Sequence, residues 1–127
     1  MILVDTDVLV AHLRGREQAR SWLRSARLQG PLWVSVVTVA ELTGGMRPAE
    51  RREVWGLLSS LRAEPVTDLI ARRAGELMRQ YRRSHAGIGT ADCLIAATAM
   101  HHGVEPATLN VRHFPMFPNL KPPFTLP

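Results

Sequence analysis

The sequence predicts a layered α/β fold with a mostly parallel sheet. Short apolar runs, typical of buried strands, alternate with amphipathic stretches of helical period, and the alternation continues along most of the chain. The 127 residues contain no internal repeat, low-complexity tract or interdomain linker, and this length corresponds to about one domain. We therefore expect a single domain over residues 1–127.

The N-terminal half predicts two strands, each followed by helices. Residues 2–4 form a continuous apolar run, as in buried parallel strands, and a short helix capped by Thr6 or Asp7 follows it. Apolar stripes, capping residues and boundary Gly or Pro define the next elements. These are a helix over 17–29, a strand over 32–34, a helix capped by Ser35 that ends at 44–45, and a helix that opens at Pro48 and carries an apolar stripe to Leu61.

The C-terminal half predicts shorter strands and a proline-rich tail. Six of the nine prolines lie between Pro106 and Pro127, so the tail is expected to be an extended edge and not a helix. The elements before it are predicted from the same signals as above. They are a very short strand at 65–66, a helix capped by Thr67 that ends before 87–89, a helix of small residues over 90–100, and a strand over 107–109.

The composition is basic and rich in arginine. Lysine and arginine total 16 against 11 acids, a formal net charge of +5, and fifteen of the cations are arginine. Because the guanidinium group suits phosphate, this charge favours a nucleic-acid partner, with solvated helix faces as the alternative. The single cysteine excludes an internal disulfide framework. Without an apolar run near ~20 residues or a signal-peptide pattern, we expect a cytoplasmic protein with no membrane partner.

Three carboxylates stand in apolar surroundings. Asp5 ends the first predicted strand, at the sheet edge where α/β proteins bind ligands, although it can instead cap the next helix. Glu41 shares a helix face with Val37 and Ala40, so we expect it to be buried there unless it lies at the edge of the stripe. Asp92 lies in the first turn of a helix whose small residues allow a close approach to the sheet, and there the helix dipole also favours an acid.

Together these acids predict a metal site. Three carboxylates converging in one pocket would repel one another and take up protons unless a divalent cation lay among them. Mg²⁺ is commonly held by one or two carboxylates and keeps positions that can meet a substrate phosphate. A divalent cation is therefore the chemistry that best explains these acids.

Four segments carry a further signal, and they follow one another in order at 1–9, 36–42, 87–99 and 108–114. The first three contain Met-Ile-Leu-Val-Asp-Thr-Asp, Val-Ala-Glu-Leu and Gly-Thr-Ala-Asp-Cys. Together they resemble the PIN-domain family, and within it the VapC-type toxin ribonucleases of bacterial toxin–antitoxin pairs. The resemblance spans nearly the whole chain. It implies a three-layer α/β/α fold with a mostly parallel central sheet of four to five short strands.

The resemblance also implies roles for single residues. Asp5, Glu41 and Asp92 are implied to be the catalytic acids that hold Mg²⁺ or Mn²⁺, and the Thr6 hydroxyl is implied to support the pocket. The family often has a further acid where Asn110 or His113 stands in this chain, but neither residue is acidic here. Asn110 can still offer an amide oxygen, and the missing charge argues against a second metal.

The implied activity is hydrolysis of RNA phosphodiesters by water, which leaves 5′-phosphate and 3′-hydroxyl ends. The resemblance implies an RNA substrate, a cognate VapB-type antitoxin whose C-terminal segment covers a helical groove, and a homodimer. The apolar stripes around Trp22 and Trp55 are candidate contact surfaces, unless core packing consumes them. Which RNA is cleaved does not follow from the sequence.

Two other functions are compatible with the residues. A haloacid-dehalogenase-type phosphatase also places Asp-x-Asp after an apolar strand, as at Asp5 and Asp7, but it needs a catalytic lysine, and Lys121 lies in the tail. A non-catalytic PIN-like interaction module would bind a partner or RNA without cleaving it, and the missing fourth acid is its support. Cys93 and His85 are expected to be an inert buried thiol and a surface histidine.

Overall fold

The computed structural model describes residues 1–84 and 87–127, and His85 lies outside the described residues. None of the helices described is long and apolar enough to cross a membrane. The strands are β1 (Ile2–Val4), β2 (Leu32–Ser35), β3 (Arg62–Glu64) and β4 (Pro106–Ala107). The helices are α1 (Thr6–Leu13), α2 (Glu17–Leu28), α3 (Val36–Gly45), α4 (Arg51–Ser59), α5 (Asp68–Tyr81) and α6 (Thr90–His101), with short 3-10 turns η1 (Pro48–Glu50) and η2 (Val111–His113).

The four strands form one parallel sheet, which confirms the predicted α/β class. Their order is β3-β2-β1-β4. In the register of the sheet, Ile2 of β1 lies opposite Leu32 of β2, and Leu3 lies opposite Pro106 of β4. Because β1 is an inner strand, Asp5, which follows it, lies in the middle of the carboxyl edge of the sheet.

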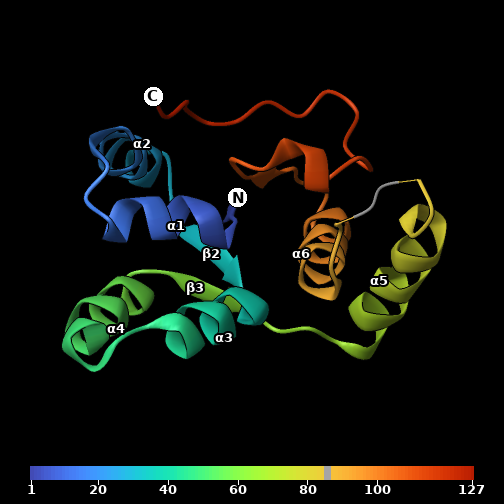
Figure 1. Ribbon diagram of the computed structural model, residues 1–127, viewed down its shortest axis with the longest axis horizontal. Coiled ribbons are helices and arrows are strands. Elements are labelled where there is room, and N and C mark those ends of the chain that lie inside the picture. The colour runs from blue at the N-terminus through green and yellow to red at the C-terminus, as the bar shows by residue number, and fades with distance from the viewer. Residues whose placement is uncertain (85–86) are drawn as a thin grey trace.

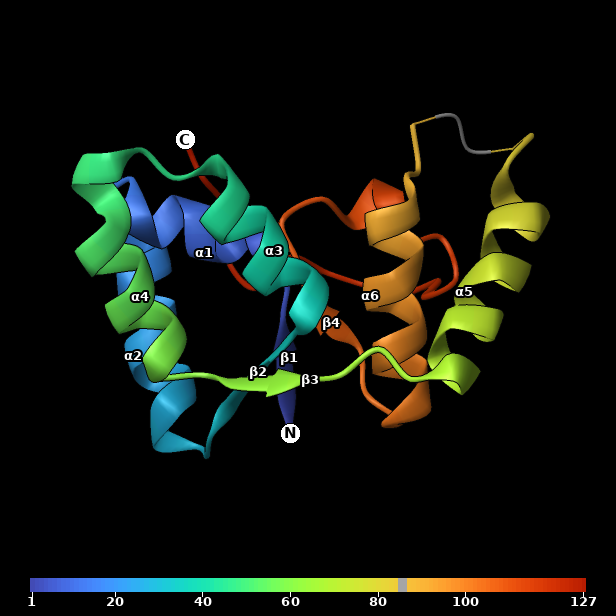
Figure 2. The ribbon, with the colours of Figure 1, turned by 90° about the horizontal axis from the view of Figure 1, so that it is seen from below.

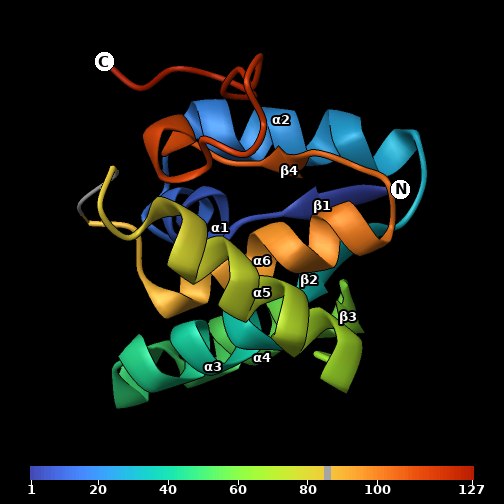
Figure 3. The same cartoon turned by 90° about the vertical axis from the view of Figure 1, so that its right-hand side faces the viewer.

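Helices cover both faces of the sheet, so the fold has the three layers that the resemblance implies. Figure 2 shows α1, α2 and α4 on one side of the strands and α5 with α6 on the other, while α3 continues from the end of β2 and contacts both groups. Seen from the side of α5 in Figure 3, these two helices lie against each other across their face of the sheet. The C-terminal tail returns toward α2 (Figure 1), where the Phe124 ring lies 6.3 Å from the Trp22 ring.

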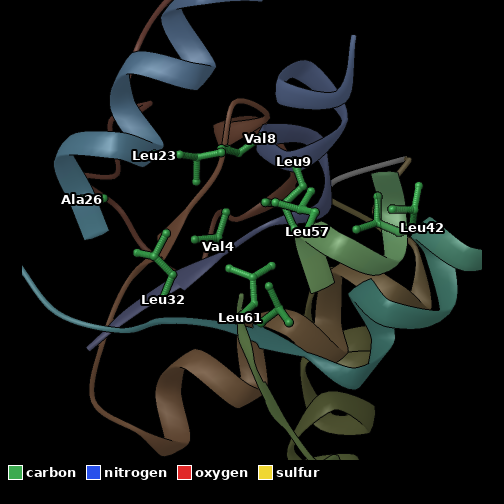
Figure 4. Packing of buried hydrophobic residues seen from close by; sticks show 11 residues of the cluster. Val4, Val8, Leu9, Leu23, Ala26, Leu32, Leu42, Leu57 and Leu61 are labelled. Carbon is green, nitrogen blue, oxygen red and sulfur yellow. The ribbon is translucent and has the colours of Figure 1, made fainter. Parts of the chain in front are cut away.

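Successive side chains of β1 point to opposite faces of the sheet, so the core has one part on each face. Val4 packs with residues of α1 to α4, and Figure 4 shows it among Val8, Leu9 and Leu23. Leu3 packs on the opposite face with residues of α5 and α6. The alanines at 96, 97 and 99 of α6 are fully buried, so this helix does approach the sheet closely, as its small residues predict. That approach carries the N-terminal turn of α6 to the edge where Asp5 lies.

Two strands differ from the prediction. β3 lies three residues earlier than expected, at Arg62–Glu64, because it is an outer strand and pairs with β2 through its backbone without needing apolar side chains. Pro65 follows it and has no N–H to extend the ladder. The last strand ends at Ala107 and not at 109, since Thr108 and Leu109 form hydrogen bonds with the carboxylates that follow β1.

The proline-rich tail agrees with the prediction in part. It begins with β4 (Pro106–Ala107), which is an edge strand of the sheet, and among the described residues after Ala107 it forms no α-helix and no further strand. The turn η2 follows, and Phe114, directly after this turn, is fully buried in the core beside α5 and α6. Beyond β4, buried apolar side chains and not strand pairing hold the tail to the fold.

Candidate active site

The carboxyl edge of the sheet borders a cavity of about 440 Å³. Asp5 follows β1 directly, α3 begins where β2 ends, and α6 brings its first turn to the same place. The structure gathers every residue predicted for the site around this one cavity. These residues are Asp5, Thr6, Glu41, Asp92 and Asn110.

Asp5 is buried, with 6% of its surface exposed. One carboxylate oxygen accepts the Thr6 backbone N–H at 2.8 Å, and the other accepts the Thr108 hydroxyl at 2.7 Å. Asp5 is therefore the residue that caps α1, and the expectation that Thr6 or Asp7 caps it was wrong. Burial, followed by the charge of Asp7, raises the pKa of Asp5 from 3.8 to about 7. Ionising this carboxyl at neutral pH therefore costs free energy unless a positive charge compensates it.

Glu41 is exposed, contrary to the prediction that it lies on a buried helix face. Thr38 and Leu42 are the residues through which α3 is buried, and this orientation turns Glu41 to the open cavity. Thr6 Oγ1 lies 2.6 Å from Glu41 Oε1 and 3.0 Å from Thr38 Oγ1. Because a hydroxyl has one proton and a carboxylate only accepts, Thr6 donates to Glu41 and accepts from Thr38. Thr6 thus holds the carboxylate of Glu41 toward the cavity.

Asp92 lies in the first turn of α6 and is half-buried. Its Oδ2 atom accepts the backbone N–H of Gly89, the N-cap residue, at 3.1 Å. The same oxygen lies 3.1 Å from His113 Nδ1. The negative charge of Asp92 is one of the causes that raise the pKa of Asp5, so the two carboxylates interact across the cavity.

Asp7 and Thr108 line or support this site, and the sequence did not predict their roles. The carboxylate of Asp7 accepts the Leu109 backbone N–H at 3.1 and 3.2 Å, so it holds the segment after β4. Burial is the main cause that raises the pKa of Asp7. Thr108 is fully buried, and its hydroxyl lies 2.7 Å from Asp5 and 3.3 Å from Asp7. The sequence signal that could have identified Thr108 is its position, because it directly follows β4 in the same way as Asp5 follows β1.

Asn110 and two arginines complete the cavity wall. Asn110 is exposed, and its backbone N–H donates to Thr108 Oγ1 at 3.0 Å, which fixes the start of η2. Arg14 and Arg16, from the turn between α1 and α2, line the same cavity, and Leu126 of the tail reaches it from the other end of the chain. The lining of the cavity therefore combines carboxylates with two exposed arginines.

The donor set fits a divalent cation. Four carboxylates, those of Asp5, Asp7, Glu41 and Asp92, line one cavity, and oxygen ligands of this kind are those that Mg²⁺ and Mn²⁺ prefer. In residues 1–84 and 87–127, no three His, Cys, Asp or Glu side chains are arranged to hold a metal ion as they stand. Their oxygens accept hydrogen bonds from protein groups instead. Holding a cation here therefore requires the carboxylates to draw closer together, and each keeps lone pairs for a cation beside the hydrogen bonds that it accepts.

Comparison with known proteins identifies the family. Residues 2–115 match the PIN domain. Ribonuclease VapC10 of Mycobacterium tuberculosis is 66% identical over 127 residues, which span 100% of this chain and 96% of that protein. The chain belongs to the VapC family of PIN domains. The family expected from the four sequence segments is thereby confirmed.

Solved structures agree with the fold of this VapC-family chain. A toxin-antitoxin complex from Klebsiella pneumoniae contains a chain that matches with a TM-score of 0.80 at 24% identity, covering 99% of this chain and 100% of that one. A DNA-bound VapBC from Salmonella typhimurium matches with a TM-score of 0.77 at 23% identity, covering 95% and 96%. At these identities the two structures establish the PIN architecture alone.

Two further expectations are resolved by the fold and the family. The haloacid-dehalogenase alternative gives way to the PIN assignment, and Lys121, which such a phosphatase would need, is an exposed residue of the tail. Cys93 follows Asp92 but is buried in the core beside α5, where burial raises the pKa of its thiol. Cys93 is therefore a packing residue, as expected.

Proposed function

We propose that this VapC-family chain is a divalent-cation-dependent endoribonuclease, the toxin of a toxin–antitoxin pair. The observation that carries the proposal is the convergence of Asp5, Glu41 and Asp92 on one cavity, with Asp5 buried and its pKa raised to about 7. The 66% identity to a protein named as a ribonuclease supports RNA as the substrate.

Asp5, Glu41 and Asp92 would hold Mg²⁺ or Mn²⁺, with the amide of Asn110 beside them. When bound, the cation supplies Lewis-acid chemistry: it offsets charge on the scissile phosphate and makes water a stronger nucleophile at neutral pH. The protein contributes an arrangement of acids that is already oriented. Thr6 orients Glu41 and Thr108 orients Asp5, and both bonds are made before any ligand arrives.

RNA would enter past the two arginines that line the cavity. Arg14 and Arg16 line the cavity beside the acids, and arginine pairs well with phosphate oxygens. These two arginines are thus the candidates, among the fifteen of the chain, for contacts with the phosphates that flank the cleaved bond.

Attack by water, and not by the ribose 2′-hydroxyl, leaves 5′-phosphate and 3′-hydroxyl ends.

A VapB-type antitoxin would cover a second cavity next to the acidic one. This groove of about 510 Å³ lies among α1, α3 and α4, and Arg14 and Glu41 line both cavities. Val10 and Met46 supply apolar surface in the groove. The toxin–antitoxin and VapBC structures with the same fold support an antitoxin as the partner.

Trp55, 47% exposed on α4, is available for a homodimer or antitoxin contact, whereas Trp22 packs against the tail.

The decisive experiment compares RNA cleavage by wild type, Asp5→Asn and Asp68→Asn, with Mn²⁺ and with a chelator. Asp68 is an exposed acid of α5 that pairs with Arg72, so its variant controls for the loss of one carboxylate. We expect wild type and Asp68→Asn to cleave only with the cation and Asp5→Asn to be inactive. Each cut should leave a phosphate on the new 5′ end and a hydroxyl on the new 3′ end. Cyclic 2′,3′-phosphate ends, or cleavage by Asp5→Asn, would refute the mechanism.

The same experiment separates the proposal from a non-catalytic interaction module. The module has one argument in its favour, since Asn110 and His113 supply no fourth acid. It predicts binding of RNA or antitoxin without cation-dependent cleavage, in protein freed of antitoxin. An absence of cleavage at every protein concentration would favour the module.

A further inference from the structure

His113 is held rigidly beside the acidic cavity. It is the last residue of η2, whose turn is closed by two backbone hydrogen bonds of 3.0 Å, from His113 N to Asn110 O and from Phe114 N to Val111 O. The next residue, Phe114, is fully buried in the core that α5 and α6 share. The imidazole is therefore attached to a segment that the core fixes in place.

The imidazole lies beside Asp92 and close to Gly87. Nδ1 lies 3.1 Å from Asp92 Oδ2, and a methyl group added at Gly87 would come within 3.8 Å of Nε2. Gly87 has a φ of +95°, a conformation that favours glycine, so the ring faces backbone there and not a side chain. His113 is two-thirds buried, with 33% of its side chain exposed.

Two groups meet on one oxygen of Asp92. The Gly89 N–H donates to Oδ2 at 3.1 Å, and His113 Nδ1 lies 3.1 Å from the same oxygen, at ion-pair distance. Rotation of the carboxylate about its terminal bond would break both contacts. Neither contact involves Oδ1, so this oxygen stays available to a cation in the cavity that Asp92 lines.

We propose that His113 is a positioning residue, which orients the carboxylate of Asp92 so that Oδ1 is presented to the cation. This inference rests on the proposed function, because it concerns the same site. It requires only a proton on Nδ1, which both the neutral tautomer protonated there and the imidazolium carry. Contacts of this kind, which orient a metal-binding carboxylate from outside the metal's own ligands, strengthen metal affinity by about 10- to 100-fold.

The experiment compares His113→Asn with His113→Gln. An asparagine amide can place its N–H near the position of Nδ1, whereas a glutamine amide reaches the position of Nε2, so only the first preserves the contact with Asp92. Arg112→Gln, an exposed neighbour on the same turn, is the control. Four quantities are measured for each protein: the dissociation constant for Mn²⁺ by calorimetry, kcat and KM for RNA cleavage, and the melting temperature without metal.

We expect His113→Gln to bind Mn²⁺ about tenfold or more weakly and to lose kcat, with KM for RNA little changed. His113→Asn and Arg112→Gln should stay near wild type. Mn²⁺ binding by His113→Gln equal to that of wild type would overturn the inference, as would equal weakening in the Asn and Gln variants at unchanged melting temperature. If wild type itself binds no Mn²⁺, the proposed function fails instead, so the two failures are distinguishable.

Discussion

The Thr6 hydroxyl donates to Glu41 Oε1 at 2.6 Å, although 35 positions separate the two residues. This bond joins the first turn of α1 to α3 across the edge of the sheet. Glu41 is exposed, and an unrestrained glutamate at such a position would sample many rotamers. The hydroxyl of Thr6 is therefore what keeps the Glu41 carboxylate near Asp5 and Asp92.

Thr6→Val should weaken the site while leaving the fold intact, because valine keeps the branched shape and removes the donor. We expect Mn²⁺ affinity and cleavage rate to fall about tenfold, as for other residues that orient ligands. Thr6→Ser, which retains the hydroxyl, should stay close to wild type. Metal titration and initial rates check this, and a fully active Thr6→Val would show that Glu41 needs no such restraint.

The stability of the metal-free protein should fall as pH rises from about 4 to about 7. Burial raises the pKa of Asp5 to about 7, so the folded state keeps a proton that the unfolded chain releases near 3.8. The stabilisation that comes from this retained proton is complete below pH 3.8, the pKa in the unfolded chain, and is lost as the pH rises through about 7, the pKa in the folded protein. A tenfold difference in proton affinity between the folded and unfolded states corresponds to about 1.4 kcal/mol, which makes the total a few kcal/mol. Asp7, whose pKa is also raised, acts in the same direction.

Denaturant unfolding at about pH 4.5 and about pH 7.5, in chelator, measures this dependence. Asp5→Asn should be more stable than wild type at the higher pH and should show a flatter pH profile, because its amide carries no charge. Adding Mg²⁺ at the higher pH should raise the stability of the wild-type protein and should not raise that of Asp5→Asn. A wild-type free energy of unfolding that rises with pH over this interval would contradict the assignment.

Thr108→Val should affect both stability and the site. The Thr108 hydroxyl is buried and donates to Asp5 at 2.7 Å, so its removal leaves a buried carboxyl with one donor fewer. We expect a loss of about 1–3 kcal/mol in the free energy of unfolding and a higher pKa for Asp5. Thr98→Val, which removes another buried hydroxyl bonded only within α6, is the matched control and should leave Mn²⁺ affinity unchanged.

Replacing Arg14 and Arg16 together by alanine should weaken RNA binding more than catalysis. Both line the acidic cavity, so their loss should raise KM, leave kcat within a few-fold, and reduce the salt dependence of binding by about 0.7 per lost phosphate contact. Arg73→Ala with Arg79→Ala, two exposed arginines of α5, forms the control pair. Equal changes in both double variants would mean that net charge, and not position, governs RNA binding.

Much of this architecture was predictable because its signals are local. Apolar runs, the Ser35 and Thr67 caps and the small residues before Met100 identified strands and helices close to where the structure has them. The acids at 5, 41 and 92 were found because each interrupts or adjoins an apolar pattern. β3 was misplaced since an outer strand needs no apolar side chains, so its sequence carries no such pattern.

Other properties of the site arise only when distant segments meet. The exposure of Glu41 depends on which face of α3 packs against the sheet, and the choice of Thr38 and Leu42 is made by the neighbouring helices. The bond between Thr108 and Asp5 spans 103 positions and exists because β1 and β4 are adjacent and parallel. The contact of His113 with Asp92 likewise depends on where Phe114 enters the core. Residue type and spacing thus identify which groups are available, whereas packing determines which oxygens face the cavity and how strongly they hold protons.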